Sequence, residues 1–137
     1  MKPLRILAIE DDEVDLMSLK RALREIKLVN PVEHAVDGVE GWGRLFDEND
    51  KPHESYPDIV LLDLNMPRMG GHAFLTKLHE VDERPDCKIF VMTTSDSDQD
   101  ILDAHKFGIE GYLLKSDLVG SLREALEDLD LKWALMA

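Results

Sequence analysis

Cysteine and positive charge are scarce in this chain, and each shortage excludes a class of protein. Cys87 is the only cysteine among 137 residues, so no disulfide can form within the chain, and we expect this thiol to pack rather than react. Sixteen basic residues against 29 acidic ones give a formal net charge of −13. Because this charge repels nucleic-acid phosphates and anionic membrane surfaces, we expect no nucleic-acid partner.

Long apolar runs are also absent. No stretch approaches the roughly 18 residues that a transmembrane helix needs, and the first residues enter a strand-like run without the apolar region of a signal peptide. We therefore expect no membrane contact and a cytoplasmic location. The length suits one domain with a sizeable core. No repeat, linker or low-complexity tract interrupts it, so residues 1–137 predict a single domain without an output domain.

Short apolar runs alternate with longer segments of helical period, which is the pattern of βαβ units. The predicted strands are residues 6–9, 32–36, 59–63, 89–93 and 112–115. The predicted helices are residues 14–27, 39–47, 70–81, 98–107 and 118 onward. Apolar residues mark the buried faces of the first two helices: Leu16, Leu19, Leu23 and Ile26, then Trp42, Leu45 and Phe46. The pattern predicts an α/β protein with a parallel sheet.

Four predicted strands end on side chains that can accept a phosphoryl group, bind it or hold a metal ion beside it. The first strand runs into Glu10, Asp11 and Asp12. The third, fourth and fifth strands end respectively at Asp63, Thr93 and Lys115. In open parallel sheets the carboxyl ends of the strands lie side by side, in the crevice where α/β proteins bind ligands. We therefore expect carboxylates, a hydroxyl and an ammonium group to converge there.

The acidic residues of this set point to a metal ion. Two unit charges about 4 Å apart repel by about 4 kcal/mol even at an effective dielectric constant of 20, so clustered carboxylates need a cation. The ligands are all oxygens, which favours a hard divalent ion such as Mg²⁺. Asp11 or Asp12 could instead simply cap the next helix, but capping does not explain why Asp63 and Lys115 also end strands.

Three other kinds of site are disfavoured. Asp96–Asp100 starts like a calcium-binding EF-hand loop, but Ile101 and Phe107 stand where that loop needs glycine and glutamate. The pair Asp63 and Asn65 is similar to the DxD motif of aspartyl-phosphate phosphatases, yet an asparagine cannot act as acid or base. The five histidines lack the close spacing of metal ligands. We expect a protein that is not an enzyme.

The chain contains, in this order, the motifs IEDD, LLDLNMPRMGG, VMTTS and GYLLKSDL. Together they resemble the receiver domain of two-component response regulators over nearly the whole chain. The resemblance implies a flavodoxin-like, doubly wound, five-stranded parallel sheet of order 2-1-3-4-5 with helices on both faces. Thr93–Ser95 (TTS), the pair Lys115 and Ser116 (KS), and Trp133 near the end of the chain look most similar to single-domain regulators paired with phytochrome kinases. This similarity implies a sensor histidine kinase as partner.

The same resemblance implies a role for each candidate residue. Asp63 would accept the phosphoryl group, and Thr93 and Lys115 would bind its oxygens. Mg²⁺ would be held by Asp11, Asp63 and the backbone carbonyl of Asn65, and Glu10 would assist through a bound water. Phosphorylation would shift Thr93 and Tyr112. The surface formed by helix 98–107, the last strand and the last helix would then signal by protein–protein interaction. A phosphotransfer intermediate or phosphate sink in a phosphorelay shares every one of these residues and is the alternative function.

Three further predictions concern the last helix and two departures from the family pattern. Large apolar residues recur there at gaps of four and three, a heptad-like seam that predicts a homodimer: Leu122, Leu126, Leu129, Trp133 and Met136. Packing within one chain is the alternative. Ser116 follows the lysine where the family usually has a cis proline, so we expect a trans Lys115–Ser116 bond. Thr94 stands where the family usually has a small residue. Because its extra bulk would restrict the access of attacking water, we expect a longer-lived phosphoryl group.

Overall fold

A computed structural model describes residues 4–28, 30–64, 66, 69–94 and 106–128 of the chain. Five strands form its sheet: β1 (Ile6–Ile9), β2 (Val32–Ala35), β3 (Ile59–Asp63), β4 (Lys88–Thr93) and β5 (Gly111–Leu114). The strand order is β2-β1-β3-β4-β5, and every neighbouring pair is parallel. This confirms the predicted 2-1-3-4-5 sheet.

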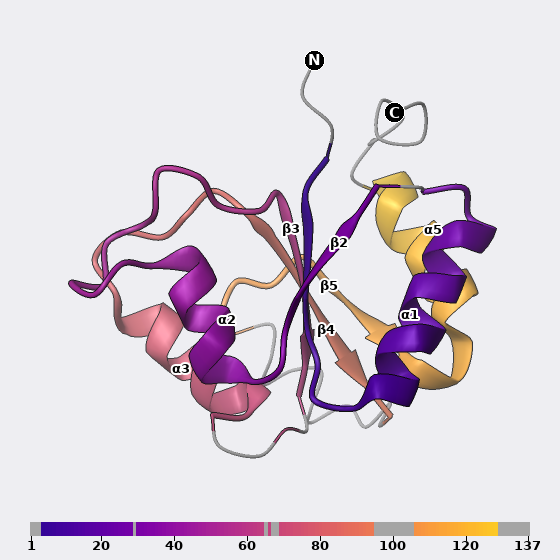
Figure 1. Cartoon of the computed structure of the whole chain (residues 1–137), viewed down its shortest axis with the longest axis horizontal. Coiled ribbons are helices and arrows are strands. Elements are labelled where there is room, and N and C mark those ends of the chain that lie inside the picture. The colour runs from indigo at the N-terminus through magenta and orange to yellow at the C-terminus, as the bar shows by residue number, and fades with distance from the viewer. Residues whose placement is uncertain (1–3, 29, 65, 67–68, 95–105, 129–137) are drawn as a thin grey trace.

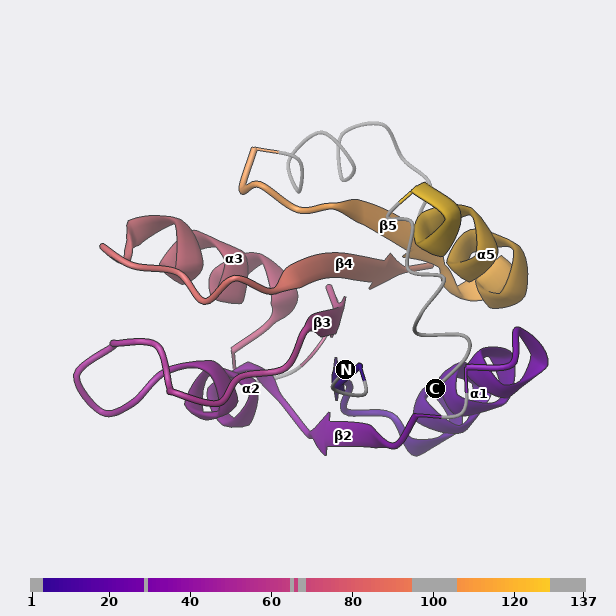
Figure 2. The same ribbon diagram turned by 90° about the horizontal axis from the view of Figure 1, so that it is seen from above.

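Helices cover both faces of the sheet (Figure 1). They are α1 (Glu13–Glu25), α2 (Gly38–Leu45), α3 (Gly71–Glu80) and α5 (Leu118–Asp128), and a short 3-10 turn, η1 (Lys115–Asp117), precedes α5. Figure 2 shows the strands as a middle layer, with α2 and α3 on one side and α1 and α5 on the other. The predicted helix over 98–107 lies almost wholly outside the described residues.

Apolar side chains on both faces of the strands explain this layering, because successive residues of a strand point to opposite sides. Ile59 and Leu61 belong to the core beneath α1 and α5, whereas Val60 and Leu62 belong to the core beneath α2 and α3. The helix residues predicted to be buried are buried, except that Ile26 is only partly so. Among the described residues, no helix is long and apolar enough to cross a membrane.

Asp12 starts α1 by satisfying the free amides of its first turn. Its side chain accepts hydrogen bonds from the backbone N–H groups of Val14, at 2.8 Å, and Asp15, at 3.1 Å. Such an N-cap is worth about 1 kcal/mol. The capping interpretation therefore holds for Asp12, and it sets where the first helical turn lies relative to the end of β1.

Candidate functional site

The parallel register brings the predicted side chains to one edge of the sheet. Asp63 ends β3 and Thr93 ends β4, while Glu10 and Lys115 directly follow β1 and β5. Glu10 and Asp63 are each 1% exposed, and Thr93 is 2% exposed. The strand ends that were predicted to converge do lie together, and they form a buried polar centre.

The end of β3 is held in place from two sides. Leu64, the next residue, donates its backbone N–H to Met92 of β4 at 3.1 Å and accepts one from Gly71 at 3.2 Å. A Cβ atom at Gly71 would lie 2.5 Å from Leu64 Cα and 2.6 Å from the Asp63 carbonyl oxygen. Only glycine lets α3 begin this close to Asp63, a constraint that the sequence pattern alone did not reveal.

Lys115 is the cation of this centre. Its Nζ atom lies 3.1 Å from Glu10 Oε1, 3.2 Å from Asp63 Oδ2 and 2.7 Å from Asp15 Oδ2. The first two carboxylates were predicted members of the site, whereas Asp15 was not. Asp15 stands in the first turn of α1, where an acidic residue is ordinary, so nothing local in the sequence marks it as a lysine partner.

Burial and charge shift the pKa values of two of these groups. Burial, followed by the hydrogen bond and the negative charge of Asp63, raises the pKa of Glu10 to about 8, although Lys115 opposes the shift. Burial alone would lower the pKa of Lys115. The hydrogen bond to Asp15 and the charges of Asp63 and Glu10 outweigh burial and raise the lysine pKa. The centre therefore keeps its ammonium group charged and is short of further positive charge.

Three carboxylates of the centre could share a metal ion. Glu10, Asp11 and Asp63 each offer an oxygen, and these atoms lie within 4.8 Å of one another. The carboxyl groups of Glu10, Asp15 and Asp63 surround the ammonium group of Lys115, and Asp11 adds another acidic group to the cluster. An oxygen-only ligand set with excess negative charge fits a hard divalent cation. Asn65, whose carbonyl was predicted to be a ligand, lies outside the described residues.

The remaining predicted features differ in how far the structure describes them. Tyr112 is 39% exposed on the edge strand β5. No cis peptide bond occurs among the described residues, so the Lys115–Ser116 bond is trans as predicted. Thr94 is exposed beside the buried Thr93, and the predicted longer life of the phosphoryl group stays a prediction. Leu129, Trp133 and Met136 lie outside the described residues.

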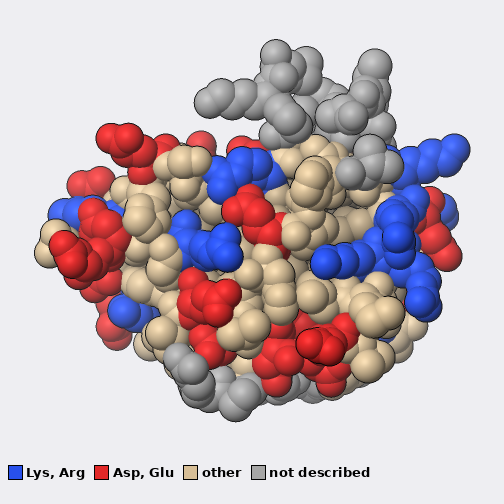
Figure 3. All heavy atoms as spheres, in the orientation of Figure 1, with Lys and Arg blue, Asp and Glu red and all other residues tan. Residues whose placement is uncertain are grey.

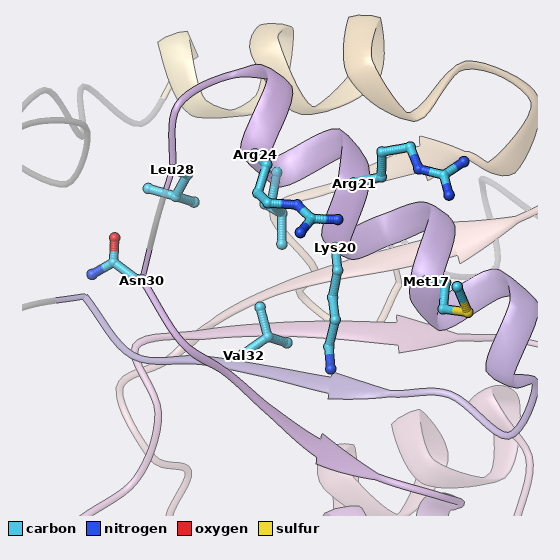
Figure 4. Close-up of a pocket in the computed structure, with 8 residues that line it drawn as sticks. Met17, Lys20, Arg21, Arg24, Leu28, Asn30 and Val32 are labelled. Carbon is cyan, nitrogen blue, oxygen red and sulfur yellow. The ribbon is translucent and has the colours of Figure 1, made fainter.

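A hollow of about 310 Å³ lies away from this centre, between the second half of α1 and the start of β2 (Figure 4). Three of its lining residues are basic: Lys20, Arg21 and Arg24. No carboxylate lines it, and none of the predicted site residues does. Figure 3 shows Lys and Arg side chains gathered over α1, whereas acidic side chains gather along the edge where the strands end.

Comparisons with known proteins place the chain in a family. The model of the response regulator receiver domain matches residues 6–127, and the chain belongs to this family. The probable methanogenesis regulatory protein FilR2 of Methanothrix harundinacea is 29% identical over 140 residues, which cover 96% of this chain and 84% of FilR2. Response regulator Rcp1 of Synechocystis is 26% identical, and the matched residues cover 96% of this chain and 89% of Rcp1.

Among solved structures, the bacteriophytochrome response regulator AtBRR superposes with a TM-score of 0.79 at 27% sequence identity. The superposition covers 97% of this chain and 96% of the AtBRR chain. The predicted family and fold are thus confirmed, as is the similarity to phytochrome-associated regulators. Receiver domains accept a phosphoryl group and act in signalling rather than as metabolic catalysts, and they bind a divalent metal at an acidic pocket.

Proposed function

We propose that this chain is a response regulator in which Asp63 accepts a phosphoryl group from a sensor histidine kinase. The observation that carries the proposal is the position of Asp63: its carboxylate ends a buried strand 3.2 Å from Lys115 Nζ, inside the acidic group that fits a metal ion. The similarity to AtBRR, a bacteriophytochrome response regulator, supports a phytochrome-type kinase as the donor.

The chemistry of the transfer follows from these side chains. An oxygen of Asp63 attacks the phosphorus of a phosphohistidine, the P–N bond breaks, and the imidazole leaves with the bonding electrons and takes a proton from water. The product is an acyl phosphate on Asp63. Lys115 and Thr93 bind its oxygens. Mg²⁺, held by Asp11, Asp63 and the backbone carbonyl of Asn65 and assisted by Glu10 through a bound water, would supply positive charge to the phosphoryl oxygens.

Signalling then requires a second state that the phosphoryl group favours. Thr93 is buried at the end of β4, and Tyr112 is exposed on the neighbouring strand β5. In our proposal Thr93 moves toward the phosphoryl group and Tyr112 turns inward. This changes a surface that includes β5 and α5, through which the protein signals by protein–protein interaction.

A homodimer through the last helix remains part of the proposal, with its contact in the later half of the predicted seam. Leu122 is 3% exposed and Leu126 is 9% exposed, because both pack into the core of their own chain beside α1. The first half of the predicted seam is thus used within the monomer. A dimer contact would depend on Leu129, Trp133 and Met136.

Intact mass after incubation with acetyl phosphate and Mg²⁺ tests the acceptor directly. We expect the native chain to gain one phosphoryl group and the Asp63→Asn variant to gain none. If the native chain also gains none, the same measurement is repeated with a phosphorylated histidine kinase as the donor. Failure of both donors, or equal labelling of the Asp63→Asn variant, would overturn the proposal.

A further inference from the structure

The shortest contact of the Lys115 ammonium group is to a residue for which the proposed chemistry has no use. Lys115 Nζ donates a hydrogen bond to Asp15 Oδ2 at 2.7 Å. Its distances to Glu10 and Asp63 are 3.1 and 3.2 Å. The partner that holds this lysine most closely therefore belongs to α1, 100 positions away in the chain.

The three carboxylates around Lys115 differ in their access to water. The side chains of Glu10 and Asp63 are 1% and 2% exposed, whereas that of Asp15 is 39% exposed. The lysine itself is 13% exposed. The ammonium group thus bridges a buried pair of carboxylates and a third carboxylate at the solvent-facing rim. The helix N-terminus favours a negative charge at that rim position.

A phosphoryl group on Asp63 would need the same ammonium group. Lys115 has three N–H donors on one compact charge. In the unphosphorylated chain it donates a hydrogen bond to Asp15 and lies 3.1 and 3.2 Å from the carboxyl oxygens of Glu10 and Asp63. Loss of Asp15 would leave Lys115 beside the buried side chains of Glu10 and Asp63, and the donor and the part of its charge that Asp15 draws to the rim would become available to the phosphoryl group.

We propose that Asp15 is a positioning residue that holds the Lys115 ammonium group at the rim and competes with the phosphoryl group for it. The competition makes Asp15 a brake: it lowers the affinity of the site for a phosphoryl donor and shortens the life of the phosphorylated state. This inference rests on the proposed phosphorylation of Asp63 and adds a residue that sets how readily that reaction occurs.

The matched control is Glu13, which stands in the same first turn of α1 and is exposed. Among the described residues, its side chain forms no ion pair or hydrogen bond. Glu13→Gln therefore removes an equal charge near the same helix end without touching Lys115. Any effect of Asp15→Asn beyond that of Glu13→Gln belongs to the contact with Lys115.

The experiment measures the rate of phosphorylation against acetyl phosphate concentration at saturating Mg²⁺, and the half-life of the phosphorylated protein after the donor is removed. We expect Asp15→Asn to lower the half-saturating concentration and lengthen the half-life, each by about three- to fivefold, as for a partly exposed ion pair. Glu13→Gln should stay near the native values. Asp15→Glu keeps a carboxylate, so its half-saturating concentration and half-life should lie closer to the native values than those of Asp15→Asn.

A Lys115→Ala background provides a readout that a merely structural role of Asp15 would not change. There, Asp15→Asn should shift both quantities no more than Glu13→Gln does. Equal shifts from Asp15→Asn and Glu13→Gln in the native background, or a higher half-saturating concentration in Asp15→Asn, would overturn the brake. Phosphorylation of Asp63 in the native chain would stand in either case. Absence of native phosphorylation with both acetyl phosphate and a phosphorylated histidine kinase would instead reject the proposed function.

Discussion

Helix α1 carries acidic residues in its first turn and basic residues in its second half, and the two ends differ in how their charges are partnered. Asp12 caps the helix, and Asp15 pairs with Lys115 of a distant element. Lys20 and Arg24 line a hollow, and their side chains form no ion pair among the described residues. The acidic end is thus tied to the reactive centre by tertiary contacts, while at the basic end Arg24, in the last turn, gains mainly from the helix dipole.

The sharpest test of this contrast compares two lysines. We expect Lys115→Ala to slow phosphorylation by acetyl phosphate about a hundredfold or more, since loss of one preorganised charged donor typically costs that much. Lys20→Ala removes the same charge from the basic hollow and should leave the rate within about twofold of native. Similar losses in both variants would show that net charge, rather than position, controls the reaction.

The reactive centre to which this acidic end is tied should also make stability depend on pH. The pKa of Glu10 is raised from 4.5 to about 8, chiefly by burial, so the folded chain keeps a proton that the unfolded chain releases above pH 4.5. Stability contributed by this group is present below that pH and is lost as pH rises toward about 8, by at most about 1.4 kcal/mol per pH unit. Lys115 is charged in both states throughout this range.

Urea midpoints at about pH 5 and about pH 8, measured in a chelator, check this slope. Glu10→Gln cannot ionise, and we expect it to flatten the decline, whereas Glu13→Gln should keep it. Mg²⁺ favours the ionised carboxylate and should also reduce the slope in the native chain. The same decline in Glu10→Gln and native protein would assign it to other groups.

The cap of α1 gives a smaller, purely local effect. Asp12→Ala removes the acceptor for two backbone amides of the first turn, and we expect a loss of about 1 kcal/mol in unfolding free energy. Asp12→Asn keeps an oxygen acceptor and should lose much less. Equal losses in the two variants would point to the charge of Asp12, rather than its cap, as the stabilising feature.

The basic end should be the least sensitive. Arg24→Gln changes an exposed side chain that has no partner among the described residues, and we expect the unfolding free energy to change by less than about 0.5 kcal/mol. Phosphorylation by acetyl phosphate should match the native rate within experimental error. A clear change in that rate would couple the hollow to the reactive centre and break the contrast between the two ends of α1.

The parallel α/β sheet and the place of the predicted site could be derived from the sequence because both depend on regular patterns, whereas the order of the strands came from the resemblance to receiver domains. Apolar runs alternating with helical periods indicate parallel strands, and parallel strands deliver their carboxyl ends to one edge. Asp63, Thr93 and Lys115 were therefore predicted to meet without knowledge of any contact between them. The capping alternative was right for Asp12, whereas Asp11 lies in the group that fits a metal ion.

Two features of the site could not be derived in this way. Gly71 belongs to a Gly-Gly pair that indicates only a helix start, but its close approach to Leu64 and Asp63 depends on how α3 packs against the sheet. Asp15 has the appearance of a routine first-turn acid. Its partner is 100 positions away, and no local periodicity connects the two.

The sequence by itself determined the parallel α/β architecture, through its apolar periodicity, and the edge at which the reactive side chains gather, through the common direction of the strands. The acidic residues at the strand ends determined the excess of negative charge there. Only the tertiary structure decided which carboxyl groups share the ammonium group of Lys115 and how strongly burial raises the pKa of Glu10. The reason is physical: hydrogen bonds and desolvation depend on distances of a few tenths of an ångström. Those distances are set only when the helices pack against the finished sheet.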